Sequence, residues 1–217
     1  SYPTTQPDAV FFGPDTYRYA RAISWLADHS PEFRPQTIMD IGAGSGAGGI
    51  FAASIFPAAP RIVLSDINPT ALAFAQINAA LNGVDVITRQ SDILAGVDGQ
   101  GDLIISNPPY LVDAGARAYR HGGGDWGCAL SMRILNEALD RLAPGGRLLL
   151  YSGAPIVEGV DMFLRAAEAT LTRRVRNFRY EEQDPDVFGE ELEHPPYDRA
   201  DRIETVVLHV TAADIIR

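Results

Sequence analysis

The stretch TIMDIGAGSGAGG, residues 37–49, joins a short apolar run to a glycine-rich turn. Residues 37–41 have the character of a buried strand, and residues 45–56 predict a helix directly after the turn. Glycines at such a junction let the chain turn sharply and let a ligand approach the backbone closely. The helix start offers free N–H groups and a partial positive charge. The stretch therefore predicts a strand–loop–helix unit that holds a ligand at its turn.

The glycines of this turn fit two patterns. Counted from Gly42 or Gly44, they fit the dinucleotide pattern G-x-G-x-x-G/A. Counted from Asp40, they fit D-x-G-x-G-x-G. The glycines alone leave both open. In either case the candidate ligand-binding residues are Asp40, Gly42, Ala43, Gly44 and Gly46.

Outward from this turn, apolar strands alternate with helix-length segments. Further strands are expected at 61–66, 84–90, 102–107 and 147–152, and helices at 69–82, 128–142 and 158–171. Such alternation predicts an α/β fold, a parallel sheet covered by helices on both faces. The last part differs, because 173–181 and 203–210 read as two strands with no helix between them.

Residues 16–29, before the first strand, predict an amphipathic helix with Tyr19, Ile23 and Leu26 on one side. This helix either covers one edge of the sheet or forms a lid near a ligand.

Acidic residues end the second and third predicted strands. Asp66 ends the second strand, where a carboxylate can accept hydrogen bonds from ribose hydroxyls. Ile67, the next residue, is also predicted to bind the ligand. Ser91 and Asp92 end the third strand, and Asp92 is placed to meet an adenine amino group. Solvated acids at strand and loop ends are the alternative reading for both carboxylates.

The segment SNPPY, residues 106–110, follows the fourth predicted strand and is more specific. Two prolines stiffen the turn and remove two N–H donors. The turn would project the Asn107 amide and the Pro108 carbonyl, which can each accept one N–H of a planar NH₂ group. Pro109 fixes the turn, and the Tyr110 ring can stack on a planar amide or base. Asn107, Pro108, Pro109 and Tyr110 are therefore the predicted catalytic residues.

With these residues the chain resembles class I methyltransferases that use S-adenosylmethionine (SAM) and a (D/N/S)PPY motif, over about residues 10–210. The resemblance implies a Rossmann-like fold with a seven-stranded, mostly parallel sheet and an antiparallel last strand. It implies SAM as cofactor, S-adenosylhomocysteine as product, and Asn107 beside both cofactor and acceptor. It also implies one domain, residues 1–217, in which residues 1–35 are a helical cap or lid on the core 36–217.

Within that group the chain looks most like the HemK-type glutamine methyltransferases. HGGGDWGCALSMRIL, residues 121–135, is close to the loop that follows their motif, apart from the inserted Trp126. Their R-P-x-T-E stretch is only partly kept in FFGPDTYRYA, residues 11–20, and their helical N-terminal substrate domain is absent. The resemblance favours a glutamine amide in a protein as acceptor, with adenine N6 or guanine N2 in RNA or DNA as the alternative. A non-catalytic SAM-binding subunit is less favoured because the NPPY motif is intact, and an NAD-dependent oxidoreductase is less favoured because NPPY has no role in hydride transfer.

Composition narrows the remaining classes. The net charge of −10 disfavours a broad nucleic-acid footprint. The single cysteine, Cys128, excludes an internal disulfide, fits a cytoplasmic protein, and reads as a small packing residue. No zinc pattern is present. The charge-free residues 41–60 read as a glycine loop and a buried helix rather than a membrane span. The oligomeric state stays open.

Three further segments carry weaker signals. Residues 111–127 form a glycine-rich loop that is either a mobile flap or plain loop, and its Arg117, Arg120 and His121 either meet an anionic substrate or stay solvated. Residues 181–201 are acidic, contain HPPY at 194–197, and read as a loop at the substrate entrance. One basic cluster reads as solvated surface or as a nucleic-acid contact; it comprises Arg165, Arg173, Arg174, Arg176 and Arg179.

Overall fold

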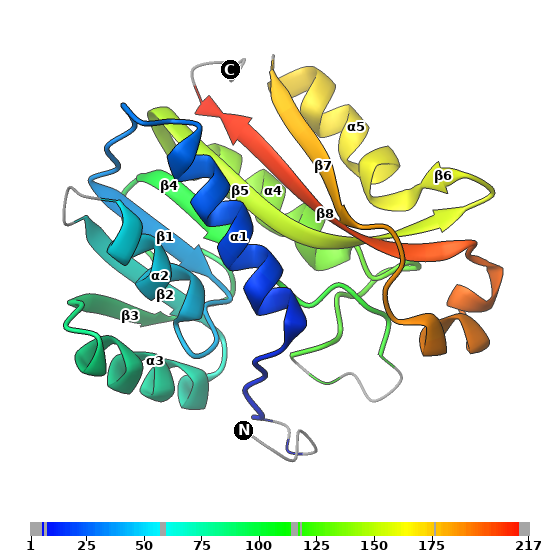
Figure 1. The fold of residues 1–217 in the computed structure, drawn as a ribbon, viewed down its shortest axis with the longest axis horizontal. Coiled ribbons are helices and arrows are strands. Elements are labelled where there is room, and N and C mark those ends of the chain that lie inside the picture. The colour runs from blue at the N-terminus through cyan, green and yellow to red at the C-terminus, as the bar shows by residue number, and fades with distance from the viewer. Residues whose placement is uncertain are drawn as a thin grey trace.

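One twisted sheet with helices on both faces makes up the computed structural model of this chain (Figure 1). The structure describes residues 6, 8–56, 60–113, 117, 119–175 and 177–212. The strand order is β3-β2-β1-β4-β5-β8-β7, with β6 paired to β5 outside this path. The strands are β1 (Thr37–Ile41), β2 (Arg61–Asp66), β3 (Val86–Gln90), β4 (Gly101–Ser106), β5 (Leu142–Val157), β6 (Val160–Asp161), β7 (Phe178–Asp184) and β8 (Arg202–Thr211).

The strand directions confirm the expected sheet. β1 to β5 pair in parallel, whereas β8 is antiparallel to both β5 and β7. The last strand of the chain therefore runs against the other six along the path. The short β6 was not predicted; it pairs antiparallel with the end of β5.

In the described part of the chain, five α-helices cover the two faces of the sheet. They are α1 (Pro14–Asp28), α2 (Ala47–Ile55), α3 (Pro69–Leu81), α4 (Ala129–Arg141) and α5 (Met162–Arg174). Alternation along β1 separates two cores, because successive side chains point to opposite faces. Ile38 packs with side chains of α1, α2 and α3, while Met39 and Ile41 pack with those of α4 and α5.

Helix α1 buries the side that its sequence predicted, including Tyr19, Ile23 and Leu26. It lies across a face of the sheet rather than along an edge, against α2 and β5 (Figure 1). The Trp25 ring stacks on His29 and lies 5.2 Å from the His209 ring of β8. The first turn of α1 reaches the edge of the sheet at which β1, β2 and β4 end.

The segment between α5 and β8 departs from its prediction. Arg173 and Arg174 belong to the last turn of α5, where cations face the free carbonyls of a helix end, and β7 begins later, at Phe178. Two short 3-10 helices, η1 (Gly189–Glu193) and η2 (Tyr197–Arg199), separate β7 from β8, where no helix was expected. Tyr197, the last residue of the HPPY sequence at 194–197, is buried, and its hydroxyl accepts a hydrogen bond from Val112 N–H at 2.8 Å.

The charge-free stretch around α2 is explained by burial inside the fold. Helix α2 has nine residues, of which Gly48, Gly49, Ile50 and Ala52 are buried. Within the part of the chain that the structure describes, no helix has the length and apolar character needed to cross a membrane.

Candidate functional site

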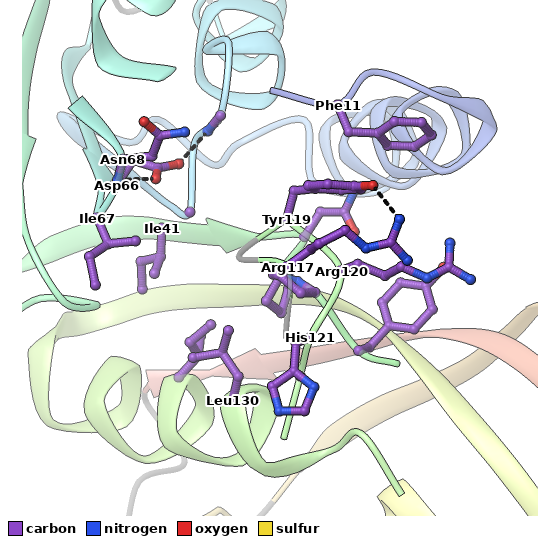
Figure 2. Close-up of a pocket in the computed structure, with 18 of the residues that line it drawn as sticks. Phe11, Ile41, Asp66, Ile67, Asn68, Arg117, Tyr119, Arg120, His121 and Leu130 are labelled. Carbon is purple, nitrogen blue, oxygen red and sulfur yellow. Dashed lines mark hydrogen bonds between the residues drawn. The ribbon is translucent and has the colours of Figure 1, made fainter. Parts of the chain in front are cut away.

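A pocket of about 690 Å³ opens where β1, β2 and β4 end (Figure 2). Parallel strands bring their carboxyl ends to one edge of a sheet, which is where open α/β folds bind ligands. Most predicted site residues line this pocket: Gly42, Gly44, Asp66, Ile67, Ser91, Asp92, Asn107, Pro108, Pro109 and Tyr110. Asp40, Ala43 and Gly46 do not line it.

The glycine loop is held open by Asp66. Gly42, Gly44 and Gly46 all have positive φ, at 65°, 55° and 83°, a region that residues with a Cβ rarely adopt. The two Asp66 oxygens accept hydrogen bonds from Gly44 N–H and Asn68 N–H, each at 2.8 Å (Figure 2). Burial raises the pKa of Asp66, and these two backbone donors oppose the rise. A backbone hydrogen bond from Ile67 also opposes the rise, and a carboxylate has about four lone-pair sites, so room remains for a ligand hydroxyl.

Asp40 lies beneath the loop instead of facing the pocket. Its carboxylate accepts hydrogen bonds from Gly49 N–H at 2.7 Å and from the Tyr19 hydroxyl at 3.3 Å. It therefore joins the start of α2 to α1, and burial raises its pKa to about 7. A Cβ on Gly46 would lie 3.1 Å from the Ala75 Cβ, so that glycine serves the approach of α2 to α3.

The NPPY segment follows β4 directly. The Asn107 side chain is partly exposed, and among the described residues neither it nor the Pro108 carbonyl takes part in a hydrogen bond. The Tyr110 hydroxyl donates to Asp15 Oδ2 at 2.5 Å. Burial and the neighbouring Asp15 charge raise the pKa of Tyr110 well above 10, so the phenol stays neutral. The segment thus presents free oxygen acceptors to the pocket beside a ring that is held in place.

Asp15 was missed by the sequence reasoning, although it stands in the altered GPDTY stretch. Its second oxygen accepts from the Tyr151 hydroxyl at 3.0 Å and pairs with Arg18 at 3.0 Å. Arg18 also pairs with Asp184 at the end of β7. One carboxylate on α1 therefore fixes the Tyr110 ring against β5. The fold alone reveals this role, because Asp15 and Tyr110 are 95 positions apart.

The glycines of HGGGDWG have a packing role around the motif. A Cβ on Gly127 would lie 2.1 Å from the Tyr110 carbonyl oxygen, and one on Gly122 would lie 2.0 Å from the Gly127 carbonyl oxygen. On the other side of the ring, a Cβ on Gly153 would lie 2.2 Å from Tyr110 Cδ2. Side chains at these positions would displace the motif, which explains why glycines surround it.

The residues predicted around the nucleoside have partners of their own. Ser91 Oγ accepts from Gly96 N–H at 2.8 Å, and Asp92 pairs with Arg133 at 2.8 Å. Ile67 lies at the pocket rim and is 61% exposed. Asn68, which the sequence reasoning also missed, caps α3 through Thr70 N–H at 2.9 Å and donates to the Asp8 carbonyl at 2.9 Å.

Aromatic rings cover the far end of the pocket. Phe11 stacks on Tyr119 with centroids 5.9 Å apart, and Figure 2 shows this pair above Arg117 and Arg120. Phe188 lies 6.0 Å from the Tyr110 ring. None of Phe11, Tyr119 and Phe188 was predicted, because each comes from a separate loop.

The cations of the 111–127 segment are neutralised locally. Arg117 and Arg120 both pair with Asp113, and hydrogen bonds from Arg117 lower the pKa of that carboxyl to about 2. Arg120 also pairs with Glu191 of the acidic segment. His121 Nδ1 accepts from Asp113 N–H at 3.1 Å. Residues 114–116 and 118 lie outside the described residues, so the flap remains a prediction.

The other candidates lie away from the pocket. Cys128 is buried, which raises its thiol pKa to about 12, in agreement with a packing role. In the basic cluster, Arg174 pairs with Asp140 and Arg179 with Glu181, while Arg176 lies outside the described residues. No group of three potential metal ligands occurs in the described ranges.

Asp40 gives the first prediction. Its carboxyl has a pKa of about 7 in the folded chain against an ordinary value of 3.8, so folding favours the protonated form. The free energy of unfolding should therefore fall as the pH rises between these two values. The Asp40→Asn side chain keeps an acceptor for Gly49 N–H and cannot ionise. The free energy of unfolding of this variant should therefore lack the part of the pH dependence that comes from Asp40. Urea unfolding of both proteins at about pH 5 and about pH 8 measures it. An equal difference between the two proteins at both pH values would contradict the prediction.

Gly153 gives the second prediction. Gly153→Ala would place a methyl carbon 2.2 Å from Tyr110 Cδ2, closer than two carbons can pack. This clash should lower the free energy of unfolding by about 1–3 kcal/mol. Gly189→Ala is the matched control, because nothing lies within 4 Å of its Cβ position and its φ is not positive. Denaturant unfolding compares the two variants. Equal stability of both would show that Tyr110 does not need the space at Gly153.

Comparisons with known proteins agree with this site. A family model described as "Methyltransferase small domain" matches residues 20–155. A release factor glutamine methyltransferase of Deinococcus radiodurans is 37% identical over 123 residues, which cover 52% of this chain and 44% of that protein. A ribosomal RNA small subunit methyltransferase C of Pasteurella multocida is 31% identical over 117 residues, covering 54% of this chain and 32% of that protein. The chain thus matches less than half the length of either relative.

A solved structure supports the fold. The tRNA m1G37 methyltransferase of M. jannaschii superposes with a TM-score of 0.61 at 19% identity, covering 96% of this chain and 52% of that one. The family match spans the glycine loop, Asp66 and the NPPY segment, which meet in one pocket of this structure. The chain belongs to the methyltransferase small domain family.

Proposed function

We propose that this chain transfers a methyl group from SAM to the side-chain amide nitrogen of a glutamine in a protein. The observation that carries the proposal is the meeting of two sets of residues in one pocket. Gly42, Gly44 and Asp66 lie at one end, and the free acceptors of Asn107 and Pro108 lie on the same sheet edge. The first set suits a nucleoside ligand, and the second suits a planar NH₂ group.

The cofactor end is formed by the ends of β1, β2 and β3. The glycine loop before α2 would lie against the methionine part of SAM, since a helix start favours a carboxylate. Asp66 would accept the ribose hydroxyls, with Ile67 against the base and Ser91 and Asp92 near its amino group. SAM, when bound, would supply an electrophilic methyl group and leave as S-adenosylhomocysteine, and the methylated amide nitrogen would release one proton to solvent. Asp40, Ala43 and Gly46 would support the loop from below.

The acceptor end is formed by NPPY and its surroundings. An amide nitrogen is a poor nucleophile because its lone pair is delocalised into the carbonyl. Asn107 Oδ1 and the Pro108 carbonyl would each accept one N–H, which holds the nitrogen in line with the methyl group and favours its rehybridisation. Positioning of this kind lowers a barrier by several kcal/mol. Pro109 stiffens the turn, and Tyr110, held by Asp15, gives a wall on which the amide can lie.

Three observations favour a protein over a nucleic acid. The chain carries a net charge of −10, and two cations that line the pocket, Arg117 and Arg120, are already paired with Asp113 and Glu191. Little positive charge is left there to meet phosphates. The relative from Deinococcus radiodurans is named for a glutamine substrate in a release factor.

We infer that residues 1–217 act as one domain, capped by residues 1–35, in the cytoplasm.

The second candidate acceptor is an amino group on a nucleobase, adenine N6 or guanine N2. The ring pair Phe11–Tyr119 and the rings of Tyr110 and Phe188 line the pocket, and aromatic faces bind bases by stacking. A relative named for ribosomal RNA supports this alternative. An enzyme of this kind on a duplex would first extrude the base.

Substitutions at the two ends of the pocket test the roles separately. Asp66→Ala should weaken SAM binding by roughly 1.5–3 kcal/mol, because a charged acceptor is lost. Asn107→Ala should leave SAM affinity nearly unchanged and lower methyl transfer by orders of magnitude. Calorimetric titration with SAM and single-turnover assays measure the two effects. Asp98→Ala is the control, an exposed acid outside the pocket. Full turnover by Asn107→Ala would exclude the proposed acceptor site.

The substrate class is tested with radiolabelled SAM and host lysate, divided into protease-treated and nuclease-treated halves. We expect label that protease removes and nuclease does not, and that Asn107→Ala does not incorporate. Label sensitive to nuclease alone would establish the nucleobase alternative. Titration with NAD separates both from an oxidoreductase, since NAD binding without SAM binding would overturn the proposal.

A further inference from the structure

A stripe of exposed apolar side chains runs along α3, away from the pocket chemistry. Phe74, Ile77 and Leu81 are 39%, 57% and 80% exposed. Spaced three and four residues apart, they lie on one side of the helix. Residues 67–84 contain no charged side chain, although the chain has a net charge of −10. A surface helix ordinarily carries charges on its outer face, and contiguous exposed apolar side chains mark an interaction site.

An open sheet edge lies beside α3, on the side of the helix that carries Gln76. Strand β3 ends the sheet, and in the described residues β2 is its one paired neighbour. Helix α3 packs on β3, and Gln76 Nε2 donates to Thr88 Oγ1 at 2.8 Å. Figure 1 shows α3 and β3 together at one end of the sheet. The stripe and residues 85–90 are called the α3–β3 surface below. Its free strand edge is a template for another strand.

The sequence of this edge is self-complementary. If β3 pairs antiparallel with a copy of itself about Ile87, Val86 lies opposite Thr88 and Asp85 lies opposite Arg89. Asp85 and Arg89 are both exposed, and two-fold symmetry forms this pair twice. Opposite charges directly across antiparallel strands stabilise the pairing. An axis at Thr88 would instead set Ile87 against Arg89 and leave Asp85 without a match.

We propose that the α3–β3 surface binds a second copy of this chain, joining two sheets through antiparallel β3 strands. The two-fold axis stands perpendicular to the sheet, so both α3 helices lie on the same side of the joined sheet, and the sides that face each other carry no charge. Two chains of net charge −10 repel each other over most of their surfaces. The charge-free face of α3 is where this repulsion is smallest, and Asp85 and Arg89 set the register.

Sedimentation velocity on the full 217-residue chain, over a wide concentration range, tests the proposal. The wild-type chain should sediment as a dimer that dissociates on dilution. Arg89→Asp sets two acids opposite each other and should give a monomer. The double variant Asp85→Arg with Arg89→Asp restores opposite charges at unchanged net charge and should restore the dimer. Ile77→Glu should also give a monomer, and circular dichroism checks that each variant is folded.

Phe178→Glu is the matched control. It replaces another exposed apolar residue on β7, at the opposite end of the sheet, and should leave the dimer intact. A wild-type chain that is monomeric throughout would overturn the proposal and assign the α3–β3 surface to a different protein. A dimer that survives Arg89→Asp and Ile77→Glu, or that is lost in Phe178→Glu, would also overturn it. A folded double variant that stays monomeric would overturn the register about Ile87.

Discussion

The hydrogen bonds to Asp66 hold together the part of the fold on which the pocket depends. One carboxylate at the end of β2 accepts from Gly44 in the loop after β1 and from Asn68 before α3. Glycines with positive φ have little conformational preference of their own, so the loop needs a fixed partner. Because β1 and β2 are parallel neighbours, the carboxylate reaches the loop without a long connection. The site thus inherits its rigidity from the sheet.

A second carboxylate does the same for the acceptor end. Asp15 on α1 receives both the Tyr110 and Tyr151 hydroxyls, which ties the NPPY segment and β5 to the N-terminal helix. Gly122, Gly127 and Gly153 leave the room in which Tyr110 lies. Helix α1 is therefore a fixed wall of the site and a cover of the sheet at once. The lid role of this helix stays a prediction.

The paired cations give the pocket its electrostatic character. Arg117 and Arg120 share Asp113, and Arg120 reaches Glu191 in the acidic segment before β8. Their charges hold loops together instead of meeting phosphate. The surface that carries no charge at all lies elsewhere, on α3, beside the open edge of β3. The pocket meets the start of α3 at Ala71, and the apolar stripe follows from Phe74 to Leu81.

The antiparallel last strand was implied by the resemblance to class I methyltransferases. The sequence by itself determined the strand–helix alternation and many of the residues that line the pocket at the ends of β1, β2 and β4. Those features follow from local patterns, since hydrophobic periodicity and Pro and Gly positions act over a few residues. Only the tertiary structure decided that Asp40 supports the loop from below, that Asp15 holds Tyr110, and that Phe11, Tyr119 and Phe188 cover the pocket. It also placed Arg173 and Arg174 in α5 and two short helices before β8. These are contacts between residues far apart in the chain, and no local pattern encodes a partner 95 positions away.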